Sequence, residues 1–169
     1  GRYRGQGGPP DGPALRANNP ATMVWLVGST ILTIFVLVWG LALLANDQSG
    51  ESNAEMTVDV TGQQWLWSFE YPGTQVKSNE LYLPVDTEVL FQVTSEDVVH
   101  GFWIPQMGIK VNANPSATTT TSVMPNKIGV YDVRCTEICG LNHSVMVTRV
   151  HVLSQSDFKK WLAEQPASI

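Results

Sequence analysis

Charge is missing from one long stretch of this sequence. No charged residue occurs between Arg16 and Asp47, and the run from Met23 to Ala45 is almost continuously apolar. As a helix, that run would be about 35 Å long, which is enough to cross the hydrocarbon core of a bilayer. The absence of charge argues against a globular core helix and predicts a transmembrane helix. The run is longer than the apolar core of a signal peptide, so we expect a retained anchor.

Positive charge is also scarce. The chain has 10 Lys and Arg residues against 15 Asp and Glu residues, a net charge of −5. This balance argues against nucleic-acid binding and suits a basic partner. Three basic residues precede the apolar run and three acidic residues follow it, namely Arg2, Arg4, Arg16, Asp47, Glu51 and Glu55. The positive-inside rule therefore predicts a cytoplasmic N-terminus and an external remainder.

Helical periodicity is absent between Met56 and residue 153. Six segments instead alternate in hydrophobicity or are rich in β-branched and aromatic residues, with turn residues between them: residues 56–60, 64–71, 88–94, 118–123, 129–134 and 145–153. We expect a mainly β protein with a Greek-key β-sandwich. The residues from Ser154 onward resemble a helix start followed by apolar residues on one face, which predicts a short C-terminal helix.

No internal repeat or low-complexity segment indicates a second soluble domain. The predicted order is a cytoplasmic Gly/Pro-rich tail without regular structure, a transmembrane helix, a linker, the β-sandwich and the C-terminal helix. These parts correspond to residues 1–22, 23–45, 46–56, 57–153 and 154–169.

Cysteine and histidine are rare, but most of them lie close together. The chain has 2 cysteines and 3 histidines, and Cys135, Cys139 and His143 fall in one short segment that Met146 completes. Sulfur ligands combined with imidazole select copper, and His100 is the natural second imidazole. A single electron-transfer copper needs only one cysteine. The second thiolate therefore predicts two coppers, with both sulfurs bridging the pair and one histidine capping each metal.

Two other interpretations of the cluster remain open but are weaker. Zinc accepts two cysteines and two histidines, but it does not require Met146, and common zinc pairs use a two-residue spacer. A disulfide would close a very short loop, where the entropic gain is smallest, and would leave His143 unexplained. The third histidine, His151, lies in an alternating run. We expect it to point to solvent and assign it no function.

Three motifs carry a specific resemblance to a known family. They read Gln64-Trp65-Leu-Trp67-Ser-Phe-Glu70-Tyr-Pro72, Ser95-Glu-Asp-Val-Val-His100 and Cys135-x-Glu137-x-Cys139-Gly-x-Asn-His143-x-x-Met146. Together they resemble cytochrome c oxidase subunit II, the CuA-bearing subunit of haem-copper oxidases, over about residues 61–161 and the preceding anchor helix. The resemblance implies a cupredoxin domain with a dinuclear CuA centre.

The resemblance also implies roles for individual residues. Cys135 and Cys139 would bridge two copper ions that His100 and His143 cap, and Met146 and the backbone carbonyl of Glu137 would be weak ligands. The Glu137 side chain would reach an interfacial magnesium or manganese, unless it is merely exposed. Trp65 matches the residue that receives electrons from cytochrome c, although packing within the sandwich is its alternative, and for Trp67 we favour packing. Glu70 and Asp97 would attract a basic donor.

Some features depart from the family pattern. Asn112 replaces the usual Asp, and Pro115-Ser116-Ala117 replaces Pro-Gly-Arg, which weakens any inference about subunit contacts from that loop. Most members have two transmembrane helices, whereas this sequence shows one, as in some prokaryotic oxidases. A first helix could have been removed by processing.

The function implied is that of an electron-input subunit. It would accept electrons from cytochrome c or a small copper protein and pass them to haem in catalytic subunit I, where haem and CuB reduce oxygen to water. We expect a single-pass protein of a prokaryotic plasma membrane, with its copper domain periplasmic or extracellular. The alternatives are the CuA subunit of a nitric oxide reductase, less readily a nitrous oxide reductase domain, and a membrane-tethered copper-delivery protein.

Overall fold

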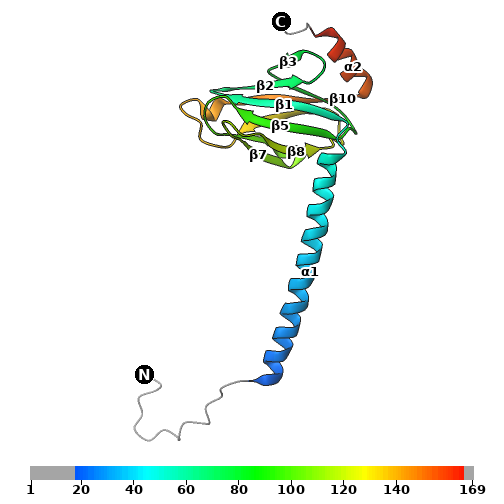
Figure 1. The fold of residues 1–169 in the computed structure, drawn as a ribbon, viewed down its shortest axis with the longest axis vertical. Coiled ribbons are helices and arrows are strands. Elements are labelled where there is room, and N and C mark those ends of the chain that lie inside the picture. Colours follow the sequence, from blue (N-terminus) through cyan, green and yellow to red (C-terminus); the bar gives the residue numbers. More distant parts are fainter. Residues whose placement is uncertain (1–17, 166–169) are drawn as a thin grey trace, which may run out of the picture. The chain divides into compact units, whose positions relative to one another are not determined.

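The computed structural model describes residues 18–165 and contains a long helix and a β domain (Figure 1). Two compact units divide between Leu44 and Ala45. The predicted N-terminal tail lies outside the described residues as far as residue 17. The side chains of residues 47–52 also lie outside the described part of the chain. The two regions together carry most of the charges from which the orientation was predicted.

The helix α1 runs from Asn19 to Ser52 and extends beyond the predicted helix at both ends. Asn18 caps it, because Asn18 Oδ1 accepts a hydrogen bond from the Ala21 N–H at 3.3 Å, and Pro20 is tolerated in the first turn. At the other end no proline interrupts the helix, so it continues through part of the predicted linker. Its segment Asn19–Asn46 has 28 residues and a mean hydropathy of 2.3, and its length and composition allow it to cross a membrane.

Within the described residues, the β domain consists of two five-stranded sheets with orders β3-β2-β1-β5-β8 and β4-β10-β9-β6-β7. The strands are β1 (Met56–Gln63), β2 (Leu66–Tyr71), β3 (Val76–Ser78), β4 (Leu81–Pro84), β5 (Val89–Ser95), β6 (His100–Ile104), β7 (Ile109–Ala113), β8 (Thr119–Val123), β9 (Gly129–Cys135) and β10 (Val147–Leu153). Two pairs, β1 with β5 and β4 with β10, are parallel, and the others are antiparallel. The predicted mainly β class and Greek-key β-sandwich are confirmed.

The core lies between the sheets because alternate strand residues point inward. Aromatic and aliphatic side chains from both sheets fill it, including the fully buried Val58, Phe69, Phe91, Phe102 and Val150. The aromatic ring of Phe102 contacts those of Trp67, Phe69 and Phe91. This packing supports β6, the strand that carries His100.

The strand predictions were incomplete in one informative respect. All six predicted segments contain strands with shifted ends, but β3, β4, β6 and β7 were missed. The strand β6 is buried along nearly its whole length and so lacks alternation. His100 is the first residue of this strand.

The predicted C-terminal helix is confirmed as α2 (Gln155–Glu164). Ser154 caps it, because its Oγ accepts a hydrogen bond from the Asp157 N–H at 3.1 Å. The Trp161 ring stacks on Tyr82 of β4, with centroids 4.1 Å apart. This contact fastens the helix to the edge of the second sheet.

His151 does not simply point to solvent, and that expectation is wrong. Its side chain is 24% exposed, with Nε2 2.9 Å from Glu80 Oε2. Its ring stacks on Tyr82, with centroids 4.6 Å apart. The neighbouring strand β4 supplies both partners, which position in the sequence alone does not reveal.

Candidate metal centre

Two separate segments supply the predicted copper ligands. His100 begins β6, and Cys135 ends β9, with Phe102 of β6 paired to Cys135. The connection from β9 to β10 contains Cys139 and the 3₁₀ turn His143–Val145, and Met146 caps that turn. Pairing of β6 with β9 therefore brings His100 beside the cysteine-bearing loop.

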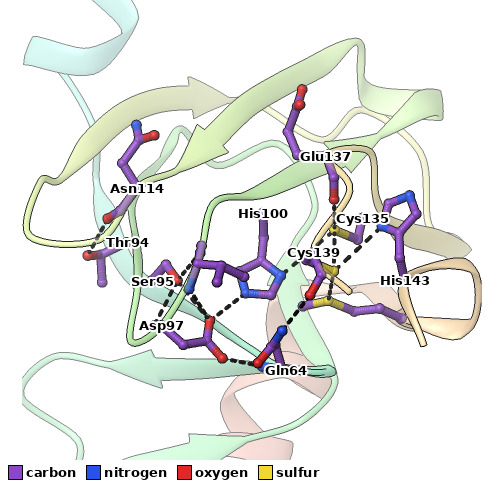
Figure 2. Close-up of polar contacts among 12 residues, drawn as sticks. Gln64, Thr94, Ser95, Asp97, His100, Asn114, Cys135, Glu137, Cys139 and His143 are labelled. Atoms are coloured by element: carbon purple, nitrogen blue, oxygen red, sulfur yellow. Dashed lines mark hydrogen bonds and ion pairs between the residues drawn. The ribbon is translucent and has the colours of Figure 1, made fainter. Parts of the chain in front are cut away.

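The ligand atoms of these residues converge (Figure 2). The two Sγ atoms are 3.7 Å apart. His100 Nδ1 lies 3.9 Å from Cys135 Sγ, and His143 Nδ1 lies 3.6 Å from Cys139 Sγ. Met146 Sδ is 3.8 Å from Cys139 Sγ. The arrangement presents two imidazole nitrogens, two thiols and one thioether around a common centre.

Glu137 contributes its backbone to the same centre. Its carbonyl oxygen lies 3.3 Å from Cys135 Sγ, whereas its side chain points away from the sulfur atoms (Figure 2). The carbonyl thus faces the predicted copper site. Among the described residues at this centre, no candidate ligand group includes the Glu137 carboxylate, so the predicted magnesium or manganese site stays a prediction.

Both cysteines are free thiols, since their sulfurs are farther apart than the roughly 2.05 Å of a disulfide bond. His100 is 0% exposed, Cys139 2% and Met146 1%. Burial, and then the neighbouring Cys135 thiol, raise the pKa of Cys139. Two adjacent thiolates are therefore costly unless a soft cation neutralises them. The donor set and its burial fit copper.

Asp97 orients His100. One carboxylate oxygen, Oδ1, lies 2.8 Å from His100 Nε2 and accepts the Val98 N–H at 2.6 Å, and Oδ2 accepts the Gln64 N–H at 2.8 Å. Partial burial acts to raise the pKa of Asp97, but the hydrogen bonds from His100 and the two backbone groups outweigh it and lower the pKa to about 2. An ionised Asp97 accepts a hydrogen bond from Nε2, and Nδ1 is the ring nitrogen that faces Cys135.

This role for Asp97 was not predicted from the sequence, where Asp97 was considered only as a surface charge. Its side chain is 26% exposed, so it differs from a freely solvated docking group. The available signal was its position three residues before His100, within reach of the same imidazole.

Glu70, the other predicted docking residue, is exposed on β2 opposite Lys77.

Asp97→Asn should lower the unfolding free energy of the copper-free chain by about 1–2 kcal/mol at neutral pH. The pKa of Asp97 is lower in the folded chain than its ordinary value of 3.8, so its contribution is present above that value and is lost as pH falls toward about 2. Urea denaturation at several pH values should therefore show the unfolding free energies of the wild-type and Asp97→Asn chains converging in acid. A difference that is independent of pH would contradict this assignment.

The two tryptophans of the first motif have different surroundings. Trp67 is buried, and its ring meets His100 edge-on with centroids 5.9 Å apart, which confirms the expected packing. Trp65 lies in the turn between β1 and β2 and is half-buried. Its indole is close to Gly140, immediately after Cys139.

Gly101 permits close contact between the two ligand-bearing segments. The Thr136 N–H donates to the Gly101 carbonyl at 3.0 Å. A Cβ at residue 101 would overlap Thr136 Oγ1 and lie 3.0 Å from the Glu137 nitrogen. Glycine is therefore required for His100 and Cys135 to approach one another.

Gly101→Ala should reduce the unfolding free energy by about 1–3 kcal/mol because the added methyl group forces the two segments apart. Chemical denaturation of the copper-free chain measures this loss. Adding Thr136→Ala should restore part of it, since the nearest overlapping atom is then removed. An unchanged midpoint in the Gly101→Ala chain would show that the segments separate without cost.

Large apolar side chains on the loop that carries the ligands are exposed. Ile138 is 89% exposed, Leu141 91% and Val145 71%, and all three lie on the ligand-bearing connection between β9 and β10. Leu66, beside Trp65, is 45% exposed. Large exposed apolar side chains on one loop are typical of protein interaction sites.

Comparisons with known proteins agree with this geometry. The family model for "Cytochrome C oxidase subunit II, periplasmic domain" matches residues 74–153. Cytochrome c oxidase subunit 2 of Thermostichus vulcanus is 39% identical over 113 residues, covering 67% of this chain and 34% of that protein. The corresponding subunit of Yponomeuta malinellus is 31% identical over 163 residues, covering 83% of this chain and 71% of that protein. The chain thus spans only about a third of the first relative.

A solved structure has a similar fold. The periplasmic domain of cytochrome oxidase subunit II from Bradyrhizobium japonicum has 29% sequence identity and a TM-score of 0.64, with 67% of this chain and 94% of that chain covered.

Proposed function

Because this chain belongs to the cytochrome c oxidase subunit II family, we propose that it is the electron-input subunit of a terminal respiratory oxidase. The convergence of two imidazoles, two thiols and a thioether from two segments carries this proposal. The donor would be cytochrome c or a small copper protein. Electrons would pass to haem in a catalytic subunit, where haem and CuB reduce oxygen to water.

The chain's own residues would hold two copper ions. Cys135 and Cys139 would bridge them, His100 and His143 would cap them, and Met146 with the Glu137 carbonyl would act as weak ligands. When bound, the copper pair supplies reversible one-electron transfer. Burial of His100, Cys139 and Met146 limits access of water, and the carboxylate of Asp97 fixes one imidazole. Ligand atoms held in this way move little when the metal changes its oxidation state.

The exposed apolar residues on the ligand loop support a partner subunit at this surface. Ile138 and Leu141 would be covered by the catalytic subunit, which would bring its haem near the metal centre. The Glu137 side chain, directed away from the sulfurs, would then reach a magnesium or manganese at that interface. We propose that Glu70 attracts a basic donor, with Asp97 acting mainly on His100 and also adding negative charge.

Stopped-flow mixing of the copper-loaded full chain with a reduced c-type cytochrome tests this function. We expect one electron to be accepted per copper pair, with a rate that falls as ionic strength rises. Failure to accept electrons from either a reduced c-type cytochrome or a reduced small copper protein would defeat the proposal. Rapid loss of both coppers to a competing chelator would favour copper delivery. Nitric oxide reduction by the assembled complex would favour the alternative that the chain is the CuA subunit of a nitric oxide reductase.

The flanking charges and the apolar segment of α1 motivate a topology prediction. The N-terminus should lie in the cytoplasm and the copper domain outside a prokaryotic plasma membrane. External protease added to sealed, right-side-out membrane vesicles should remove the copper domain and leave a tag at the N-terminus intact. Cleavage of that tag from outside would reverse the orientation.

A further inference from the structure

Gln64 forms hydrogen bonds to the cysteine-bearing loop and to Asp97, the residue that contacts His100. Its side-chain Nε2 donates to the Cys139 carbonyl at 2.6 Å, across a separation of 75 residues. Its backbone N–H donates to Asp97 Oδ2 at 2.8 Å, and Asp97 Oδ1 lies 2.8 Å from His100 Nε2. As Figure 2 shows, one residue of the β1–β2 turn thus connects the cysteine loop with the buried histidine.

The residue after Gln64 is Trp65, and both pack against Gly140. Gly140 has φ of +122°, and a Cβ there would lie 2.9 Å from Gln64 Nε2 and 3.3 Å from Trp65 Nε1 and Cζ2. The missing side chain therefore lets the amide and the indole approach the loop beside Cys139. Trp65 Nε1 is buried and has no hydrogen-bond partner among the described residues. The indole is held there by packing, not by a hydrogen bond of its own.

We propose that Gln64 is a positioning residue for electron input, whose amide holds the β1–β2 turn so that the Trp65 indole stays against Cys139 and Gly140. The proposal deepens the proposed function and rests on it, since Trp65 has a role only if the chain accepts electrons. Gln64 itself neither binds metal nor receives the electron. Its hydrogen bond fixes the gap between the indole and a ligand-bearing peptide, and a fixed short gap is what rapid transfer requires.

The first test uses the copper-free full chain in detergent and measures hydrogen exchange of the Trp65 indole N–H by NMR. Gln64→Met keeps the side-chain length but removes the N–H donor. Loss of one hydrogen bond should raise the population of the opened turn, and hence the exchange rate, by about tenfold. Gln63→Met is the matched control, because Gln63 is the exposed neighbour on β1, and it should exchange at the wild-type rate. An unchanged rate in Gln64→Met would overturn the proposal.

The second test measures electron transfer in the copper-loaded full chain docked to a reduced c-type cytochrome. Gln64→Met should slow transfer, by at most about tenfold, while the copper content and the EPR spectrum stay unchanged. In a Trp65→Ala background, Gln64→Met should slow transfer no further, because it acts through the indole. Additive slowing would overturn the proposal. A wild-type chain that accepted no electrons would defeat the proposed function, whereas the exchange measurement would still test the contact between Gln64 and Trp65.

Discussion

Replacing Cys139 with serine is expected to abolish the shared copper centre and, with it, electron transfer to the partner subunit. Cys139 Sγ lies within 3.8 Å of three other donor atoms, Cys135 Sγ, His143 Nδ1 and Met146 Sδ. A serine hydroxyl is a hard donor that does not replace a bridging thiolate on copper. Copper content, the visible spectrum and EPR of the full chain measure the effect.

Ser144→Ala provides a matched control for the cysteine substitution. Ser144 lies in the same connection, is exposed, and belongs to the turn that carries His143. This variant should retain two coppers and a wild-type spectrum. If Cys139→Ser also kept two coppers that share an unpaired electron, bridging by this thiolate would be wrong.

If the Trp65 indole is the electron-input residue, as proposed, Trp65→Ala is expected to slow electron transfer from the docked donor by about a hundredfold or more, because the indole would then span the gap between donor and ligand loop. The copper content should not change, since Trp65 supplies no ligand atom. The salt dependence of association should also be preserved, because no charge is removed. Stopped-flow reduction of the copper-loaded full chain by its native donor measures both quantities.

Leu66→Ala is the control for the tryptophan substitution, because it removes apolar surface from the next residue, which is 45% exposed. It should weaken docking modestly and leave transfer within the docked complex unchanged. A Trp65→Ala chain reduced at the wild-type rate would exclude the indole as the electron-input residue.

Much of the fold could be predicted because its signals are local. Alternation along the strands and the cap at Ser154 depend on neighbouring residues, and both led to elements that the structure contains. The strand β6 escaped prediction because burial on both faces removes alternation. The ends of α1 also differed from those of the predicted helix, because an N-terminal cap and the absence of proline set them. Hydrophobicity defines only the part of the helix that is able to span a membrane.

The candidate site was predictable for a different reason. Soft ligands are rare in this chain, so their spacing stands out, and the structure brings His100, Cys135 and Cys139 together. The supporting contacts were not predictable. The hydrogen bond from Gln64 to Cys139 joins residues 75 positions apart, and the packing of Trp65 on Gly140 depends on the folded path of the loop. Nothing in the local sequence encodes such contacts.

Copper stoichiometry combined with EPR spectroscopy of the full chain tests the central claim most directly. Two coppers per chain are expected, and the mixed-valence state should share one unpaired electron between both nuclei, giving more hyperfine lines than one copper nucleus produces. A single copper with the ordinary one-nucleus pattern, or zinc at full occupancy in the native protein, would contradict a dinuclear electron-transfer centre.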